Sequence, residues 1–422
     1  MGKSYQQDSN EEISLMAQVL ERDNLLQALK QVVRNKGVAG VDGMSVEELP
    51  DYLKQHWPDI KARLEAGVYQ PQPVLRIEIP KANGKKRKLG IPTVTDRMIQ
   101  QAIAQVLSPR WEPLFHPNSY GFRPLRSAQQ AVRTAQSEIN NGKQWVVDLD
   151  LEAFFDRVNH DRLMNTLKGE TKDKTLLRLI NSYLKTGTEI NGQYEKTTEG
   201  VPQGSPLSPL LANIVLNELD WELEKRGHIF VRYADDCQIY VSSQRAGERV
   251  KQSLTYFIEH TLRLKVNESK SAVDRPWKRK FLGFTFSPRR GHKLKVSEAA
   301  LEKLKYTVRG LCRRTRGKSI YQIIAELRKS LLGWKAYFGI AEIKSQLRDI
   351  DKWIRRKLRC YLYKQWGRSG YRKLRKLGVK RQLAWNTAKS AHGPWRLSNS
   401  PALTYALSNK YFANLGLPSL VA

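Results

Sequence analysis

The segment VRYADDCQIY, residues 231–240, places two adjacent carboxylates between two runs of residues that favour strands. Asp235 and Asp236 stand where this pattern predicts the turn of a β-hairpin. Asp148 and Asp150 lie two residues apart in the apolar stretch WVVDLDL, which predicts a buried strand. Side chains two apart in a strand point to the same face of a sheet. The sequence therefore predicts a group of acids within an otherwise apolar sheet.

Such a group of acids needs a counter-charge. Like charges buried side by side cost several kcal/mol unless cations compensate them. Mg²⁺ suits the group because it takes carboxylate oxygens as ligands and leaves room for water and substrate phosphate. Two Mg²⁺ ions about 4 Å apart, or Mn²⁺ in their place, would activate an attacking 3′-hydroxyl and stabilise a leaving pyrophosphate. The acids thus indicate nucleotidyl transfer, although an Asp-Asp pair taken alone is common in ordinary turns.

The composition excludes several other classes of protein. A chain of 422 residues can hold two or three domains, and no apolar run approaches the roughly 20 residues that a membrane-spanning helix needs. The N-terminus shows no secretory signal, so we expect a cytoplasmic protein without membrane partners. Cys237, Cys312 and Cys360 stand far apart without a CxxC pair, which argues against disulfides and a zinc ribbon.

Positive charge is concentrated in the last third of the chain. Residues 278–422 contain 35 Lys and Arg against 6 Asp and Glu, whereas residues 1–277 contain 38 against 35. A near-neutral body followed by a strongly basic third is typical of a protein that binds a polyanion. Aromatic residues among these charges suit nucleic acid. Solvated helix faces and an anionic membrane surface are the alternative interpretations.

The apolar pattern changes near residue 293. Before this point predicted strands and helices alternate, and they include a basic hairpin over residues 74–91. After it the apolar spacing is helical throughout, at residues 298–314, 319–338 and 344–366. The sequence therefore predicts an α+β region followed by an all-α region.

Several short motifs carry a resemblance to a known family. The motifs that resemble, in order, the successive blocks of reverse transcriptases are LDLEAFFD (149–156), GVPQGSPLSP (200–209), YADD (233–236), LKVNESKS (264–271) and FLGF (281–284). Two earlier stretches, PKANGKKRKLGIPTVTDR and SYGFRP, are similar to those of group II intron-encoded proteins. The resemblance extends from about residue 15 to the end of the chain.

The resemblance implies a right-hand polymerase fold. Fingers and a palm, whose antiparallel sheet is flanked by helices, would be followed by an all-α thumb or maturase domain. The implied parts are an N-terminal extension (1–75), fingers and palm (76–292), the thumb or maturase domain (293–385) and a small DNA-binding segment (386–422). Longer relatives continue into an endonuclease. Because this chain stops at Ala422, we expect no second-strand cleavage, as in the proteins of class C introns.

The resemblance also assigns site residues. Asp150, Asp235 and Asp236 correspond to the catalytic, metal-binding acids, and Phe155 to the steric gate that excludes a ribose 2′-hydroxyl. The residues that correspond to dNTP-binding positions are Lys81, Arg87, Gln203 and Arg123, with Arg97 as a further candidate. The candidates for protonating the leaving pyrophosphate are Lys270 and Lys265. We expect structural roles for Asp148, Asp156, His116 and His160. The candidate nucleic-acid contacts of the basic third are Trp334, Arg355, Arg356, Lys357 and Arg359.

The implied activity is RNA-directed DNA polymerisation. The implied partners are dNTPs, an RNA template with a DNA or RNA primer, target DNA, and a group II intron RNA whose splicing and retrohoming the protein assists. A second hypothesis is an RNA-binding maturase whose polymerase is dispensable, but the complete set of acids argues against it. A third, a domesticated reverse transcriptase in DNA repair or phage defence, is left open by the sequence.

Overall fold

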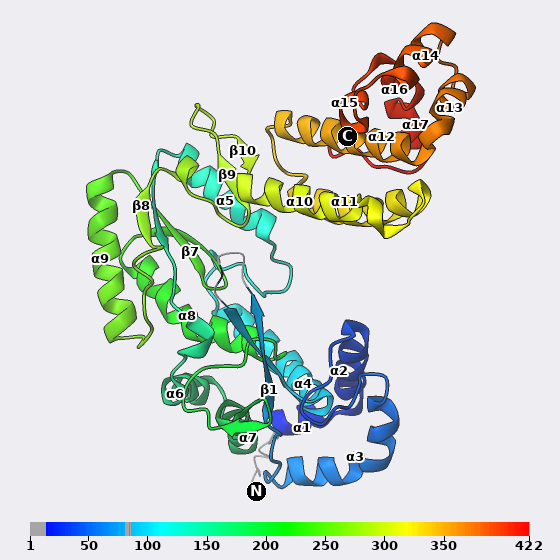
Figure 1. Ribbon diagram of the computed structural model, residues 1–422. Helices are drawn as coiled ribbons and strands as arrows, with labels where there is room; N and C mark the ends of the chain where they lie inside the picture. The colour runs from blue at the N-terminus through cyan, green and yellow to red at the C-terminus, as the bar shows by residue number, and fades with distance from the viewer. Residues whose placement is uncertain (1–13, 81–83, 85, 422) are drawn as a thin grey trace, which may run out of the picture. The chain divides into compact units, whose positions relative to one another are not determined.

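The computed structural model of the protein describes residues 14–80, 84 and 86–421. Its contacts divide the chain into two compact units. The first unit runs to Ala135 and resumes over Lys143–Asp274, and the second takes Gln136–Gly142 and Arg275–Ala422. The mixed first unit and the mainly helical second unit confirm the predicted α+β class (Figure 1).

The helices of the first unit follow its amphipathic segments. They are α1 (Leu15–Leu20), α2 (Arg22–Asn35), α3 (Leu49–Glu65), α4 (Val94–Trp111), α6 (His160–Glu170), α7 (Lys174–Lys185), α8 (Ser208–Lys225), α9 (Gln244–His260) and the first part of α5 (Ala128–Asn140), whose residues from Gln136 on belong to the second unit. Side-chain oxygens cap several N-termini, as Thr93 does for α4 by accepting from the backbone N–H of Asp96. None of the described helices combines the length and the hydropathy that a membrane crossing requires.

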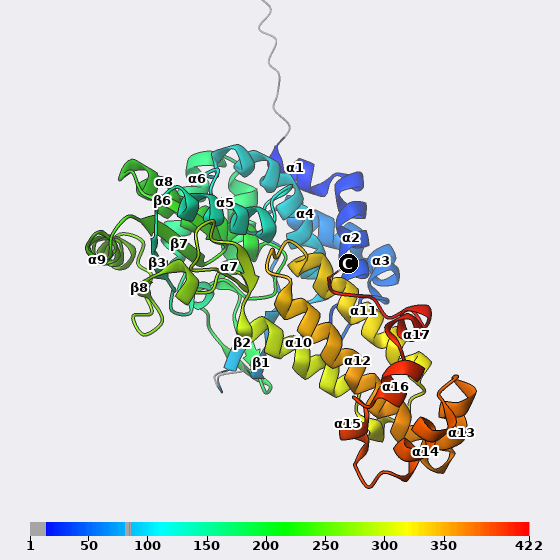
Figure 2. The same ribbon diagram turned by 90° about the horizontal axis from the view of Figure 1, so that it is seen from above.

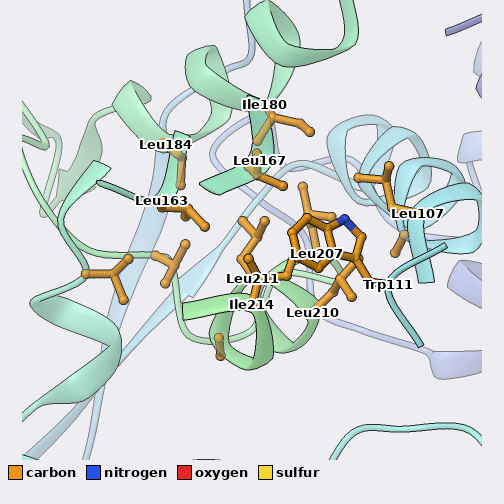
Figure 3. Close-up of a cluster of buried hydrophobic side chains, with 14 of the residues drawn as sticks. Leu107, Trp111, Leu163, Leu167, Ile180, Leu184, Leu207, Leu210, Leu211 and Ile214 are labelled. Carbon is orange, nitrogen blue, oxygen red and sulfur yellow. The ribbon is translucent and has the colours of Figure 1, made fainter. Parts of the chain in front are cut away.

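Four of these helices build the centre of the core in the first unit. Leucine, isoleucine and tryptophan side chains from α4, α6, α7 and α8 meet there (Figure 3). Leu107 and Trp111 of α4 lie toward Leu207 and Leu210 at the start of α8 in this view. The apolar faces explain why these segments fold as helices against one another, because most helical stability in proteins comes from such packing.

Two sheets accompany this core. The first has the order β2-β1-β4-β5, from β1 (Val74–Pro80), β2 (Lys86–Ile91), β4 (Thr188–Ile190) and β5 (Gln193–Glu195). β1 and β2 pair antiparallel as the predicted basic hairpin, whose tip at Asn83 lies outside the described residues. The second sheet has the order β6-β7-β3-β8, from β3 (Trp145–Leu149), β6 (Ile229–Tyr233), β7 (Asp236–Val241) and β8 (Ala272–Asp274). Its pairs are antiparallel, and α9 packs against β3, β7 and β8.

The second unit begins with a short hairpin and continues as helices. The hairpin pairs β9 (Phe284–Phe286) with β10 (Leu294–Val296). The long helices are α10 (Glu298–Leu311), α11 (Ile320–Phe338) and α12 (Ser345–Trp366), which run side by side in Figure 2. The short helices α13 (Gly370–Lys376), α14 (Arg381–Lys389), α15 (Pro394–Leu397), α16 (Pro401–Ala406) and α17 (Asn409–Asn414) follow. The three helices predicted after residue 298 are thereby confirmed.

The hairpin joins the second unit earlier than the change of apolar pattern near residue 293 suggests. Side chains of the helical region hold it there: the Tyr337 hydroxyl donates to the Leu282 carbonyl at 3.0 Å, and Glu342 accepts from the Leu294 backbone N–H at 2.7 Å. These contacts explain why the second unit starts at Arg275. The predicted four-part division itself stays a prediction.

Candidate active site

Strand pairing brings the predicted acids to one end of the second sheet. β3 and β7 are antiparallel, with Asp148 opposite Gln238 and Leu149 opposite Cys237. Continuing this register by one residue sets Asp150 opposite Asp236. Opposite residues of an antiparallel pair have Cα atoms about 5 Å apart and side chains on the same face. The fold thus places Asp150 beside the turn that carries the Asp-Asp pair.

A two-residue turn carries Asp235 outward. Tyr233 pairs with Asp236, so Ala234 and Asp235 form the loop of the β6–β7 hairpin. Ala234 has a positive φ of 56°, as two-residue hairpin turns require at their first position. Asp235 is exposed and forms no hydrogen bond or ion pair with any residue that the structure describes, whereas Asp236 is half-buried in β7. The two adjacent carboxylates therefore occupy different surroundings.

The segment LKVNESKS lies alongside the residues that follow β3. The backbone N–H of Asn267 donates to the Asp150 carbonyl, and that of Glu152 donates to the Lys265 carbonyl, both at 2.8 Å. This pairing sets the Lys270 ammonium 3.2 Å from a carboxylate oxygen of Asp150, and the Lys265 ammonium 3.4 Å from Glu152. Of the two predicted proton donors, Lys270 is the one in contact with a predicted catalytic acid.

The acids suit a divalent ion by their chemistry. Asp150, Asp235 and Asp236 supply carboxylate oxygens from two neighbouring strands, which are the ligands that Mg²⁺ prefers. Within the described residues no three carboxylate, His or Cys side chains converge closely enough to hold a metal ion, and Asp150 has Lys270 as its cation. The carboxylate chemistry of the three acids thus suits Mg²⁺, although their side chains do not converge on one point here, and binding the ion would require Asp150 to exchange Lys270.

A buried ion pair supports the hairpin from within, and the sequence analysis missed it. Arg232 has an exposed fraction of 0% and forms two hydrogen bonds to the Asp220 carboxylate of α8, at 2.7 and 2.5 Å. Its other donors reach Asn213, Ser119 and the carbonyl of Ala234, the last at 2.9 Å. All five guanidinium N–H groups are engaged, so Arg232 ties the turn before Asp235 directly to α8. An arginine within the apolar run FVRY was the signal that a buried acid must pair with it.

The SYGFRP motif forms a second support for the same turn. Its backbone pairs with Arg232, because the Tyr120 N–H donates to the Arg232 carbonyl at 2.9 Å. A Cβ atom on Gly121 would come within 2.3 Å of the Ala234 nitrogen, so only glycine allows this approach. The five N–H groups of Arg123 donate to Glu112 and to the carbonyls of Glu112, His116 and Ser119. These contacts hold the loop, and the contact of Arg123 with a nucleotide stays a prediction.

The predicted steric gate and the PQG loop are linked through their backbones. The Val201 N–H donates to the Phe155 carbonyl at 2.6 Å, and the half-buried Phe155 ring lies edge-on to Phe154 with centroids 5.1 Å apart. The Gln203 carbonyl accepts from the N–H of Gly90 in β2 at 2.8 Å. The loop thus connects the end of the basic hairpin to the segment after β3, and it holds Gln203 between them.

The predicted triphosphate contacts of the basic hairpin are only partly described. Lys81 and the side chain of Arg87 lie outside the described residues. Arg97 is buried at the start of α4, and its Nη2 donates to the Val38 carbonyl in the loop after α2. Burial lowers the pKa of this guanidinium. Arg97 therefore fastens that loop, and any contact with a nucleotide remains a prediction.

Other candidates make contacts within the protein, and the structural roles expected of them stay predictions. The ring of His116 donates through Nε2 to Glu224, since its Nδ1 accepts from the Asn118 backbone. His160 lies 2.7 Å from the carbonyl of Gly200, and Asp148 accepts from Gln238 at 3.4 Å. Asp156 lies in the 3₁₀ turn after β3. Burial raises the pKa of the Cys237 thiol far above its ordinary value, which keeps it unreactive.

The predicted nucleic-acid contacts of α12 divide into two kinds. Arg356 lies 4.0 Å above the ring of Trp395, with Lys357 5.4 Å from the same ring. Arg355 is half-buried and has no hydrogen bond with any described residue. Arg359, in contrast, is 8% exposed and donates to the Leu407 carbonyl at 3.0 Å. The guanidinium of Arg359 therefore packs inside the unit, which argues against its predicted contact with nucleic acid.

Trp334 of α11 was predicted to contact nucleic acid as well. It is half-buried, and its ring packs on Phe338 with centroids 4.5 Å apart. Part of the ring therefore serves the packing of the helix, and its contact with nucleic acid stays a prediction.

Comparison with known proteins agrees with this geometry. A family described as reverse transcriptase (RNA-dependent DNA polymerase) matches residues 79–286, and the maturase-specific domain of group II introns matches residues 301–378. YkfC of Escherichia coli is 32% identical over 61% of this chain and 78% of its own length. The group II intron-encoded protein LtrA of Lactococcus lactis is 31% identical over 70% of this chain. The chain spans 60% of the length of LtrA.

The chain also shares a partial likeness with solved structures. A chain of the partial Cas6-RT-Cas1–Cas2 complex has a TM-score of 0.38 at 27% identity, over 59% of this chain and 44% of that one. Apo telomerase from Candida tropicalis has a TM-score of 0.43 at 16% identity, over 57% of this chain and 60% of that one. The assignment rests on the family matches and the sequence relatives. The chain belongs to the reverse transcriptase family of RNA-directed DNA polymerases, in the group that carries a group II intron maturase domain.

Proposed function

We propose that this polymerase extends a primer 3′-hydroxyl on an RNA template, with Asp150, Asp235 and Asp236 holding two Mg²⁺ ions. The observation that carries the proposal is the register of β3 against β7, which sets Asp150 beside the Asp235–Asp236 turn. When bound, the ions would supply activation of the hydroxyl and compensation of charge on the leaving pyrophosphate.

The residues around the acids have separate tasks in this proposal. Arg232 fixes the turn that presents Asp235, because it holds the carbonyl of Ala234 from the buried side. Lys270, whose ammonium lies 3.2 Å from an Asp150 oxygen, neutralises that acid and would give a proton to the leaving pyrophosphate. Phe155 lies next to Asp156 and the PQG loop, where a ring can exclude a ribose 2′-hydroxyl from the sugar site.

We also propose that the second unit binds group II intron RNA and thereby assists splicing and retrohoming. The match to the maturase-specific domain supports this partner. The excess of Lys and Arg in residues 278–422 supplies the charge that RNA phosphates require. Target DNA would be the further partner of the C-terminal segment.

The deciding experiment separates polymerisation from RNA binding. In Asp235→Asn we expect Mg²⁺-dependent dNTP incorporation on an RNA template to fall below detection, while the affinity for intron RNA stays within about twofold of the wild type. Asp161→Asn, an acid at the start of α6, is the matched control and keeps full activity. Normal incorporation by Asp235→Asn would contradict the metal site. Loss of RNA affinity in the same variant would indicate misfolding or a shared binding surface.

A further inference from the structure

One exposed aromatic residue beside the catalytic hairpin has no role in the site described above. Phe122, in the SYGFRP loop, has an exposed fraction of 55% and a positive φ of 58°. Residues other than glycine, asparagine and aspartate rarely adopt this left-handed conformation, and a bulky residue there is an outlier. An exposed ring contributes little burial energy to the fold, and a strained backbone costs conformational energy, so neither feature stabilises the protein. Strained residues gather at sites that bind ligands.

The surrounding loop is built to hold Phe122 in this conformation. On one side of it Gly121 packs so closely on the Ala234 turn that no Cβ atom fits, and its carbonyl accepts from Asn213 at 2.8 Å. On the other side the guanidinium of Arg123 is fixed by hydrogen bonds from all its N–H groups. The backbone on both sides of Phe122 is therefore anchored, while its ring is left open to solvent.

The ring lies next to the catalytic turn. Its centroid is 6.4 Å from that of Tyr233, with the two planes inclined by 42°. Tyr233 precedes Asp235 by only two residues, so the two rings form an aromatic edge at the tip of the hairpin. Under the proposed function, the primer 3′-hydroxyl would come close to Asp235, and the nucleotide that carries this hydroxyl would lie beside the aromatic edge.

We propose that Phe122, backed by Tyr233, packs against the 3′-terminal nucleotide of the primer and positions it for extension. An aromatic face offers a contact that any base can make, because every base has a π-face, and this suits an enzyme that copies all sequences. The anchored backbone reduces the conformational freedom that Phe122 loses when the primer arrives. The inference rests on the proposed polymerase function, because the primer terminus is located by Asp235.

The test is a double-mutant cycle that combines removal of the Phe122 ring with removal of the terminal base of the primer. The dissociation constant of a labelled DNA primer on an RNA template is measured for the full chain, with an intact or an abasic primer 3′-nucleotide. Phe122→Gly removes the ring and relieves the positive φ, so misfolding is not expected. We expect Phe122→Gly to weaken binding of the intact primer by about tenfold, within the range of base–aromatic stacking. For the wild type, the abasic primer should bind about tenfold more weakly than the intact primer. For Phe122→Gly, the two primers should differ in affinity by less than twofold.

A neighbouring residue provides the matched control. Leu125 has the same φ of 58° in the same loop and is 98% exposed, but it has no aromatic ring. Leu125→Gly should therefore bind both primers as the wild type does, and Phe122→Tyr should retain the tight binding of the intact primer. Equal abasic effects in the wild type and Phe122→Gly would overturn the proposal. The proposal would also be overturned if the effect of Phe122→Gly depended on an abasic site in the template strand and not on one at the primer terminus.

The same samples distinguish this inference from the proposed function. Incorporation of one dNTP is measured with the wild type on the intact primer. Failure of the wild type to incorporate a nucleotide would remove the polymerase proposal. Normal incorporation by the wild type, together with unchanged primer binding by Phe122→Gly, would remove only the role of Phe122.

Discussion

The acids of the first unit and the cations of the second unit are held in opposite ways. Asp150, Asp235 and Asp236 lie at fixed positions of a hydrogen-bonded sheet, at the end of β3 and in the β6–β7 turn. The basic residues of the second unit are spread along helices, and only some are fixed by neighbours, as Arg356 is by Trp395. A catalytic group must be placed within a fraction of an ångström, whereas a phosphate contact contributes through the sum of many charges.

This difference teaches where single substitutions should matter. In the catalytic sheet each acid, and the arginine beneath them, makes contacts that no other residue can replace. One substitution there should therefore remove activity or much of the stability. In the basic helices a lost charge should weaken binding by a small, additive amount. The following changes test this contrast, beginning with the largest expected effect.

Asp235→Ala should reduce primer extension by more than about 10³-fold, since metal stabilisation of developing charge supplies several kcal/mol of the barrier. Asp236→Ala should be less damaging, because Asp236 is half-buried in β7 while Asp235 alone stands in the turn. Single-nucleotide incorporation at saturating Mg²⁺, compared between the two variants, measures the difference. Equal or reversed losses would show that the roles of the two acids are assigned wrongly.

Arg232→Met should lower the free energy of unfolding by about 3–5 kcal/mol, because it leaves the Asp220 carboxylate buried without a cation. Denaturant unfolding followed by intrinsic fluorescence measures this loss. The double variant Arg232→Met with Asp220→Leu should recover much of the stability, since it removes both charges. It should nevertheless extend primers poorly, because the carbonyl of Ala234 has lost its donor. Full activity in the double variant would show that the pair stabilises the fold without positioning Asp235.

The acids of this sheet could be predicted from the sequence because their spacing follows the period of a strand and the turn of a hairpin. The ion pair beneath them could not be assigned, since Asp220 lies on α8, twelve residues before Arg232, and only the packing of α8 on β6 brings them together. The missing signal was local: an arginine in the middle of an apolar strand requires an acid nearby. Nothing in the sequence indicated the positive φ of Phe122.

The same distinction applies to the second unit. Its helices could be predicted from the apolar period, and the basic composition indicated a polyanionic partner. The run WIRRKLRC could not separate contact residues from packed ones by charge alone. The helical period does not do so either, because Arg355 and Arg359 follow the buried Asp351 by four and eight residues, which are both spacings of one helix face. Tertiary packing separates them, since the Arg359 guanidinium donates to the Leu407 carbonyl.

Phe155→Val should reduce the discrimination against ribonucleotides by roughly 10- to 100-fold, which is the range that a shape contact in a pocket provides. Incorporation of one ribonucleotide and of the matching deoxyribonucleotide is measured on the same primer. Phe154→Leu is a useful comparison, since Phe154 is buried and contacts the ring of Phe155. That variant should lose stability and keep most of its sugar selectivity. Unchanged selectivity in Phe155→Val would remove the assignment of this residue as the gate.

The smallest effects are expected on α12, where two arginines four residues apart provide a matched pair. Arg355→Gln should lower RNA affinity only a few-fold and reduce the slope of log K against log salt by about 0.7–0.9, the value for one lost phosphate contact. Arg359→Gln should leave this slope unchanged and lower the free energy of unfolding by about 1–3 kcal/mol, since it disturbs a buried hydrogen bond to Leu407. RNA titrations at several salt concentrations and denaturant unfolding measure the two quantities. If both variants change the slope equally, Arg359 reaches RNA despite its burial, and the contrast between packed and contacting cations within this helix fails.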